Sequence, residues 1–190
     1  MPQSVADRRH LVLIGLMGVG KSTVGRRCAH LLGRRFVDTD DVLVELARAP
    51  LAEAFATLGE ARLRDLEDQV VAETVGSDEA LVIACGGGTV VRLTNRELVR
   101  AAGIVIWLRA PTGVLIKRVG SGDGRPMLAH NPADSLERLA STRAPAYKAA
   151  ADAIVDSVAA IDTVAELVLA QFYEAQRGSI ERRRPPSPPV

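Results

Sequence analysis

Short apolar runs alternate along this chain with longer segments in which apolar residues recur at helical spacing. The apolar runs predict five strands, over Leu11–Gly15, Phe36–Val37, Leu81–Cys85, Ile104–Leu108 and Ala153–Val155. The periodic segments predict helices over Lys21–Leu32, Asp41–Ala47, Glu60–Val75, Thr112–Val119, Ser135–Tyr147 and Thr163–Gln176. Strands that are apolar throughout belong inside a parallel sheet with both faces covered. This order therefore predicts an α/β fold, built as a three-layer α/β/α sandwich.

Length and composition favour one globular domain. The chain has 190 residues, of which 47% are hydrophobic and 25% charged, as in typical soluble domains. No apolar stretch approaches the roughly 20 residues of a membrane span, and the polar segment Met1–His10 lacks the apolar region of a signal peptide. Cys28 and Cys85 lie far apart without metal-ligand spacing, which fits a reducing compartment. We therefore expect a cytoplasmic protein with no membrane partner.

Charge is distributed unevenly between the body of the chain and its C-terminal end. The formal net charge is +1, and residues 177–190 hold four arginines and one glutamate, so the preceding residues carry −2. Such a balance does not predict nucleic-acid binding by the folded part. The Arg- and Pro-rich segment 177–190 is typical of a disordered tail, with a docking or nucleic-acid role as the alternative. We expect a flexible N-terminus over 1–9 and a single domain over 10–176.

The segment Gly15–Ser22, GLMGVGKS, matches the phosphate-binding pattern GxxxxGK[ST] in full. It follows an apolar run and opens a predicted helix, which is the context that the motif requires. The glycines let backbone N–H groups surround a polyphosphate, Lys21 can reach the β- and γ-phosphates, and the Ser22 hydroxyl can ligate Mg²⁺. A glycine-rich turn with an incidental lysine is the weaker alternative. The motif predicts an ATP site whose nearest contacts come from Gly18, Val19, Gly20, Lys21, Ser22 and Thr23.

Two acids follow the second predicted strand, at the sheet edge where ligands of parallel α/β proteins bind. Asp38 and Asp40 are two residues apart, so on an extended segment their side chains point the same way. One could hold a Mg²⁺ water while the other accepts a hydrogen bond from a substrate hydroxyl. The alternative is that Asp40 or Asp41 caps the following helix.

Three glycines, Gly86–Gly88, follow the third predicted strand at the same edge. They allow backbone groups to approach a ligand closely, although a flexible turn explains them equally well. In the helix before that strand, Glu67 falls near the apolar stripe and needs a partner, for which Arg64 is placed three residues earlier. The pair could hold the guanidinium rigid for an anionic substrate. A surface ion pair is the alternative.

Two further arginines lie near glycine or proline in the second half of the chain. Arg125 sits in the glycine-rich loop Gly120–Pro126, which suits a lid that brings positive charge to a transferring phosphoryl group; a plain surface loop is the alternative. Arg143 precedes Pro145, which predicts a kink or restart of its helix. An arginine fixed beside a kink could bind a carboxylate bidentately.

These motifs occur in the order found in the shikimate kinase family, which the chain resembles from about Leu11 to Asp156. The matching segments are GLMGVGKST, FVDTD, FATLGEARLRDLE, CGGG, GRPML and RAPAY. The resemblance implies a P-loop NTPase fold of the nucleoside monophosphate kinase type, with a five-stranded parallel sheet and a mobile lid over about 118–133. It implies transfer of the γ-phosphoryl group of ATP, with Mg²⁺, to the 3-hydroxyl group of shikimate. It also favours a monomer.

The resemblance further implies roles for the acceptor side of the site. Asp40 would bind ring hydroxyls of shikimate close to the reacting one. Arg64 and Arg143 would clamp the substrate carboxylate, and Gly86–Gly88 would add backbone contacts.

On the nucleotide side, the same resemblance implies that Ser22 and Asp38 hold Mg²⁺. Lys21 and Arg125 would stabilise charge that develops on the γ-phosphoryl group, which makes them catalytic together with Asp40. Arg118 matches a position that stacks on adenine.

The chain departs from the family pattern at two places. Leu63 stands where the family usually has phenylalanine, and Val158–Asp162 lacks the basic residue and proline that often frame the adenine. Adenine contacts and acceptor specificity are therefore open. Two other functions fit the motifs, namely another small-molecule kinase such as a gluconate kinase, and a nucleotide-binding regulator without turnover.

Overall fold

A computed structural model describes residues 10–120 and 131–183. The strands are β1 His10–Ile14, β2 Phe36–Asp38, β3 Val82–Ala84, β4 Gly103–Arg109 and β5 Ala153–Asp156. The α-helices are α1 Lys21–Leu32, α2 Thr39–Ala47, α3 Leu51–Val75, α4 Leu93–Ala102, α5 Thr112–Val119, α6 Pro132–Ala150 and α7 Ile161–Arg183, and a 3₁₀ turn, η1, covers Thr89–Val91.

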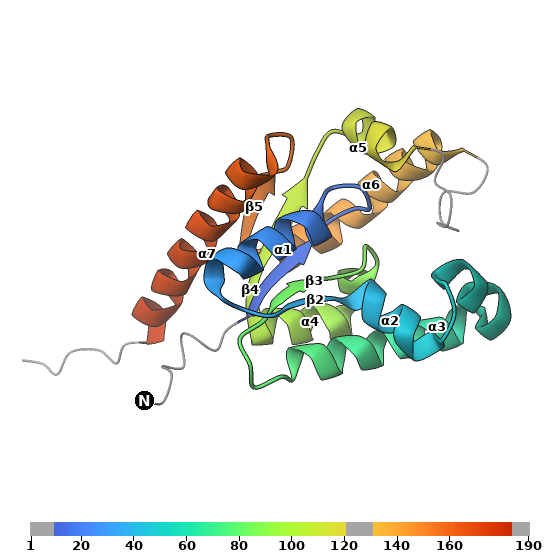
Figure 1. Ribbon diagram of the computed structural model, residues 1–190, viewed down its shortest axis with the longest axis horizontal. Helices are drawn as coiled ribbons and strands as arrows, with labels where there is room; N and C mark the ends of the chain where they lie inside the picture. Colours follow the sequence, from blue (N-terminus) through green and yellow to red (C-terminus); the bar gives the residue numbers. More distant parts are fainter. Residues whose placement is uncertain (1–9, 121–130, 184–190) are drawn as a thin grey trace, which may run out of the picture.

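The five strands form one parallel sheet in the order β2-β3-β1-β4-β5. Figure 1 shows α1 and α7 on one face of this sheet and α4 and α6 on the other, which gives three layers. Every residue of β1 and β3 is buried, as expected for strands covered on both faces. The predicted five-stranded α/β/α sandwich is confirmed.

Apolar side chains form two separate cores. The larger core fills both sides of the sheet and includes the central strands, α1 and α7. The smaller core lies between α2 and α3, beside the β2 edge, and consists of Leu43, Ala54, Leu63, Leu66 and Val70. Leu63, which stands where the resemblance predicts phenylalanine, is therefore a core residue of the unit that carries Arg64.

Five helices differ from prediction. Helix α2 starts at Thr39 rather than Asp41, and the other four differ as follows. Helix α4 was not predicted, and α3 begins at Leu51, with a break at Gly59, whose φ of 78° and ψ of 162° interrupt the helix. Helix α6 runs on past Pro145 to Ala150 without a restart. Helix α7 ends at Arg183, seven residues beyond the predicted end at Gln176. The predicted start of a disordered tail at 177 is thus too early, because no proline interrupts the helix before Pro185.

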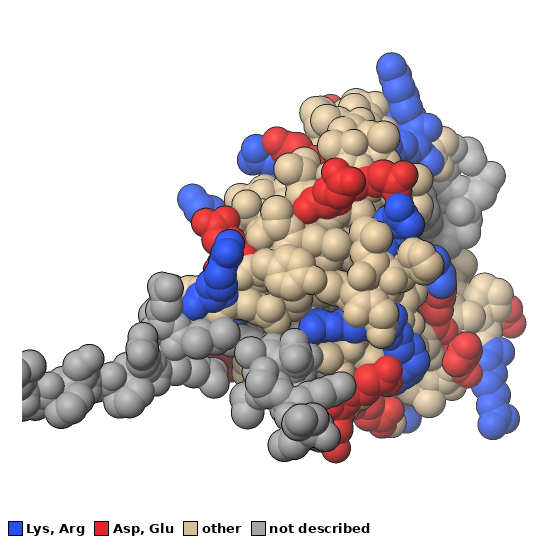
Figure 2. Space-filling model, turned by 60° about the vertical axis from the view of Figure 1, so that its left-hand side comes forward, with Lys and Arg blue, Asp and Glu red and all other residues tan. Residues whose placement is uncertain are grey.

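Acidic and basic side chains are interspersed on the face of the molecule drawn in Figure 2. None of the helices in the described part of the chain combines the length and the apolar composition that crossing a membrane requires. The division into 1–9, 10–176 and 177–190 remains otherwise a prediction, and most of the predicted lid, including Arg125, lies outside the described residues.

Candidate active site

Three neighbouring strands deliver the predicted motifs to one edge of the sheet. The phosphate-binding loop follows β1, the Asp38–Asp40 segment follows β2, and the glycine run follows β3, which lies between the other two strands. Since all strands are parallel, their carboxyl ends meet at the same edge, where ligands of open α/β sheets bind. The site is thus assembled by topology from segments distant in sequence.

The loop Gly15–Gly20 has the backbone that a phosphate cradle needs. Gly15, Gly18 and Gly20 have φ values of 142°, 77° and 99°, a region that residues with a Cβ rarely adopt. Lys21 begins α1, and its Nζ donates to the carbonyl oxygens of Gly15 at 2.9 Å and Leu16 at 3.1 Å. The ammonium group therefore lies over the cradle, on the loop that would surround the phosphates.

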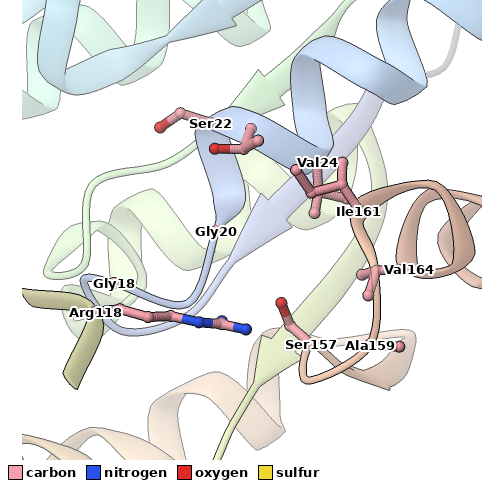
Figure 3. Close-up of a pocket in the computed structure, with 10 residues that line it drawn as sticks. Gly18, Gly20, Ser22, Val24, Arg118, Ser157, Ala159, Ile161 and Val164 are labelled. Carbon is pink, nitrogen blue, oxygen red and sulfur yellow. The ribbon is translucent and has the colours of Figure 1, made fainter. Parts of the chain in front are cut away.

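A cavity of about 500 Å³ lies beside this loop, between α1, α5 and the segment after β5. Figure 3 shows Arg118 extending from α5 towards Ser157 across this space. Ser157 Oγ donates to the Val19 carbonyl at 2.6 Å, and Arg118 Nη1 donates to the same oxygen at 3.5 Å. The remaining wall is apolar or small and consists of Gly18, Gly20, Val24, Ala159, Ile161 and Val164, with Ser22 and Thr23 at the α1 end.

Ser22 and Asp38, the two residues predicted to hold a metal, lie in direct contact. Ser22 Oγ donates to Asp38 Oδ2 at 2.5 Å. A hydroxyl and a carboxylate are the hard oxygen ligands that Mg²⁺ prefers, and Mg²⁺ usually completes its shell with phosphate oxygens and water. No group of three or more His, Cys, Asp or Glu side chains that could hold a metal occurs within residues 10–120 and 131–183. The Ser22 hydroxyl and the Asp38 carboxylate fit a Mg²⁺ ion that takes its remaining ligands from phosphate oxygens and water.

The Asp38–Asp40 segment differs from prediction in its backbone. Helix α2 starts at Thr39, and its cap is Asp38, whose Oδ1 accepts from the Asp40 N–H at 3.1 Å. The segment is thus not extended, and neither Asp40 nor Asp41 is the cap. Asp38 turns to Ser22, whereas Asp40 turns to the glycine run after β3.

Each glycine of Gly86–Gly88 faces a different predicted acceptor-site side chain. A Cβ at Gly86 would collide with Asp40 Oδ1, one at Gly87 would lie 3.1 Å from Arg143 Nη1, and one at Gly88 would lie 3.2 Å from Arg64 Nη1. None of the three glycines has a positive φ. Space rather than backbone freedom therefore requires glycine at Gly86 and leaves little room for a larger residue at Gly87 and Gly88, which favours the close-approach interpretation over the flexible turn.

The two arginines are held differently. Arg64 Nη1 donates to Glu67 at 2.6 Å, and Arg64 Nη2 lies 3.6 Å from Glu60. Arg143 on α6 is 9% exposed and lies beside Tyr147, whose hydroxyl donates to the Gly87 carbonyl at 2.7 Å. Burial raises the pKa of Tyr147, and the charge of Arg143 and its hydrogen bond with the phenol oppose that shift. Helices α3 and α6 thus place two guanidinium groups on one short loop.

Asp40 has an electrostatic environment that differs from that of Asp38. Burial raises the pKa of Asp40 to about 6; the negative charges of Asp38, Glu67 and Asp41 act in the same direction, and Lys21 opposes them. A carboxyl group with a pKa near the working pH exchanges protons most effectively. Asp40 can therefore accept a proton from a bound hydroxyl group at neutral pH.

Residues missed in the sequence include Thr39, Tyr147 and Ser157. Each is buried and places a hydroxyl group on the backbone of a phosphate-binding or glycine loop. The sequence carries only a weak signal for them, because their partners are 47, 60 and 138 residues away along the chain.

Comparisons with known proteins agree on one family. A family model described as shikimate kinase matches residues 17–173. A shikimate kinase from Novosphingobium aromaticivorans is 43% identical over 73% of this chain and 74% of that protein. One from Paramagnetospirillum magneticum is 41% identical over 87% and 83%. The solved structure of shikimate kinase from Acinetobacter baumannii in complex with shikimate is similar, with a TM-score of 0.81 and 31% identity over 93% of this chain and 96% of that chain.

Proposed function

The chain belongs to the shikimate kinase family, and we propose that it transfers the γ-phosphoryl group of MgATP to the 3-hydroxyl group of shikimate. Family membership makes it an ATP-dependent small-molecule kinase. The observation that carries the acceptor assignment is the convergence of one carboxylate and two guanidinium groups on Gly86–Gly88. A ring acid with hydroxyl groups presents the complementary set, a carboxylate for the arginines and hydroxyl hydrogens for Asp40.

The acceptor end of the site is proposed as follows. Arg64 and Arg143 bind the carboxylate of shikimate, because planar guanidinium groups match a carboxylate in geometry and charge. Glu67 keeps Arg64 in place through its 2.6 Å ion pair. Gly86–Gly88 leave room for the ring to approach the backbone. Asp40 binds a ring hydroxyl and orients it towards the nucleotide.

The nucleotide end takes its contacts from the phosphate loop and the cavity beside it. Gly18, Val19, Gly20 and Thr23 are proposed to line the phosphates and the start of the nucleoside, and Arg118 to stack on the base across the cavity. Ser22 and Asp38 would hold Mg²⁺. When bound there, Mg²⁺ neutralises charge on the β- and γ-phosphates and orients them.

The transfer itself requires positioning and charge rather than covalent help from the protein. The shikimate oxygen attacks the γ-phosphorus, the bond from that phosphorus to the bridging oxygen of ADP breaks, and the hydroxyl proton passes to Asp40. Lys21 contacts the γ-phosphate and stabilises the charge that develops on the γ-phosphoryl group. Arg125 is proposed, on the family resemblance, to supply a second cation. We further propose that the protein acts as a cytoplasmic monomer.

A coupled assay of ADP release, with and without shikimate, tests this function. We expect release that depends on shikimate, with the phosphorylated acid identified by mass spectrometry. Gluconate, which is an open-chain acid, and cyclic acids other than shikimate serve as comparison acceptors. A gluconate kinase would prefer the open-chain acid, and a regulator would release ADP at the same low rate whether or not an acceptor is present. Either result would exclude the proposed function.

A further inference from the structure

Three consecutive glycines form the surface on which Asp40, Arg64 and Arg143 meet, and such a backbone needs to be held. Glycine loses more conformational freedom on folding than any other residue. If the backbone of this loop shifted, the three charged side chains that pack against it would change position as well. The stability of this loop must therefore come from groups outside it.

Thr39 holds the first glycine. Its Oγ1 accepts from the Gly86 N–H at 2.8 Å, and Thr39 is 5% exposed. Thr39 lies between Asp38, which contacts Ser22, and Asp40, which faces Gly86. One hydroxyl group thus ties the segment after β2 to the loop after β3, beside the proposed reacting group.

Tyr147 holds the second glycine from another element. Its hydroxyl donates to the Gly87 carbonyl at 2.7 Å and interacts with Arg143, one helical turn earlier on α6. The ring is 1% exposed and lies 5.6 Å from that of Trp107, the only tryptophan of the chain. The phenol therefore connects the loop to the arginine proposed to bind the carboxylate.

The other loop carbonyls are also paired. The Gly86 and Gly88 carbonyls accept from the N–H groups of Thr89 and Val91, both at 3.1 Å. Among the described residues, no acceptor is found for the N–H groups of Gly87 and Gly88. The pattern of bonds fixes the loop while leaving two donors for a ligand.

We propose that Thr39 and Tyr147 are positioning residues whose buried hydroxyl groups hold Gly86–Gly88 between the three charged side chains and so set the affinity for the acceptor. This inference rests on the proposed function. Neither hydroxyl needs to touch the acceptor or ATP. Their removal should affect shikimate far more than the nucleotide.

The test uses the full chain with Thr39→Val, Thr39→Ser and Tyr147→Phe. Valine keeps the shape of threonine without its acceptor, serine keeps the hydroxyl, and phenylalanine keeps the ring against Trp107. Calorimetric titrations give the Kd for shikimate and for ATP. We expect Thr39→Val and Tyr147→Phe each to raise the Kd for shikimate by about tenfold, because a part-buried backbone group of the glycine loop loses its partner. The Kd for ATP should change less than about twofold, and Thr39→Ser should bind as the wild type does.

Amide hydrogen exchange gives a readout that does not depend on the substrate. Exchange at Gly86 should quicken about tenfold in Thr39→Val and remain unchanged in Thr39→Ser. Folded Thr39→Val and Tyr147→Phe proteins with the wild-type Kd for shikimate would overturn the inference, as would an equal loss of affinity for ATP. If Thr39→Val does not fold, Tyr147→Phe decides by the same criteria. A wild-type protein that does not bind shikimate would refute the proposed function instead. The rate of amide hydrogen exchange at Gly86 would still test whether the Thr39 hydroxyl group holds the loop in place.

Discussion

The substitution Gly86→Ala tests the close packing of the acceptor site through a single methyl group. The new Cβ would lie less than 3.0 Å from Asp40 Oδ1, whereas ordinary contact begins at 3.4 Å, so the carboxylate must withdraw by more than 0.4 Å. Overpacking of this kind costs about 1–3 kcal/mol in folding free energy. A displacement of up to about 1 Å at a reacting group lowers turnover by about 100-fold.

Steady-state kinetics with shikimate and thermal unfolding measure both effects. We expect kcat of Gly86→Ala to fall by about 100-fold, with a protein that remains folded. Gly88→Ala should be milder, because the atom in its way, Arg64 Nη1, is 3.2 Å away at the end of a flexible side chain. Gly113→Ala is the matched control, since no atom lies within 4 Å of its Cβ and alanine favours the α5 helix.

The kinetic result that would refute this reasoning is a Gly86→Ala enzyme with kcat close to that of the wild type. A Gly113→Ala enzyme that lost as much activity as Gly86→Ala would also refute it. The loss would then be a general effect of replacing glycine by alanine, and would not come from a contact with Asp40.

Three further predictions concern pH and the nucleotide. Because burial raises the pKa of Asp40 to about 6, kcat/KM should fall as pH drops through about 6. Asp40→Asn should abolish this acidic fall in the pH profile and lower kcat by at least about 100-fold. The same substitution should stabilise the fold at pH 8 by about 1–3 kcal/mol, because the charged form of Asp40 is disfavoured in the folded state. His10 accepts from the Leu81 N–H at 3.0 Å and bonds the Val75 carbonyl at 3.1 Å, and burial lowers the His10 pKa from its ordinary 6.5. Its neutral form is therefore favoured in the folded state, so the contribution of His10 to the unfolding free energy should be level above pH 6.5 and decrease below it. Asp40 contributes in the opposite direction below pH 6, so the His10 contribution is measured as the difference in urea unfolding between the wild type and His10→Gln, and this difference should shrink as pH falls below 6.5. The cavity beside the phosphate-binding loop has no Asp, Glu, Asn or Gln among its described lining residues, so kcat/KM for GTP should lie within about tenfold of that for ATP. A kcat/KM for ATP more than about 1,000-fold above that for GTP would show that the protein forms specific hydrogen bonds with the edge of the base, which would contradict this prediction.

The sheet could be predicted because its strands carry a strong local signal. Residues such as Leu11, Val82 and Val105 lie in runs that are apolar on both faces, which only a covered parallel strand explains. The phosphate loop was equally clear, since its pattern and its position after a strand agree. Helix α4 was missed because it is ten residues long, begins without a side-chain cap and is polar on average.

The acceptor site could be reached only through the family resemblance, because its geometry depends on packing between distant elements. Arg64 and Arg143 read alone were more typical of a surface ion pair and a kinked helix. Their approach to Gly87 and Gly88 follows from where α3 and α6 pack. The Asp38–Asp40 segment was misjudged for a local reason, namely that capping by Asp38 starts the helix two residues early.

A binding cycle between the arginines and the acceptor carboxylate addresses the central claim most directly. Shikimate and its neutral primary amide are titrated into the wild type and into Arg64→Ala and Arg143→Ala. We expect the wild type to bind the acid at least about 30-fold more tightly than the amide, and each variant to lose most of that ratio, because charge-assisted hydrogen bonds of this kind contribute about 1.5–3 kcal/mol. A ratio that is the same in the wild type and in both variants would contradict the assignment of these arginines to the acceptor.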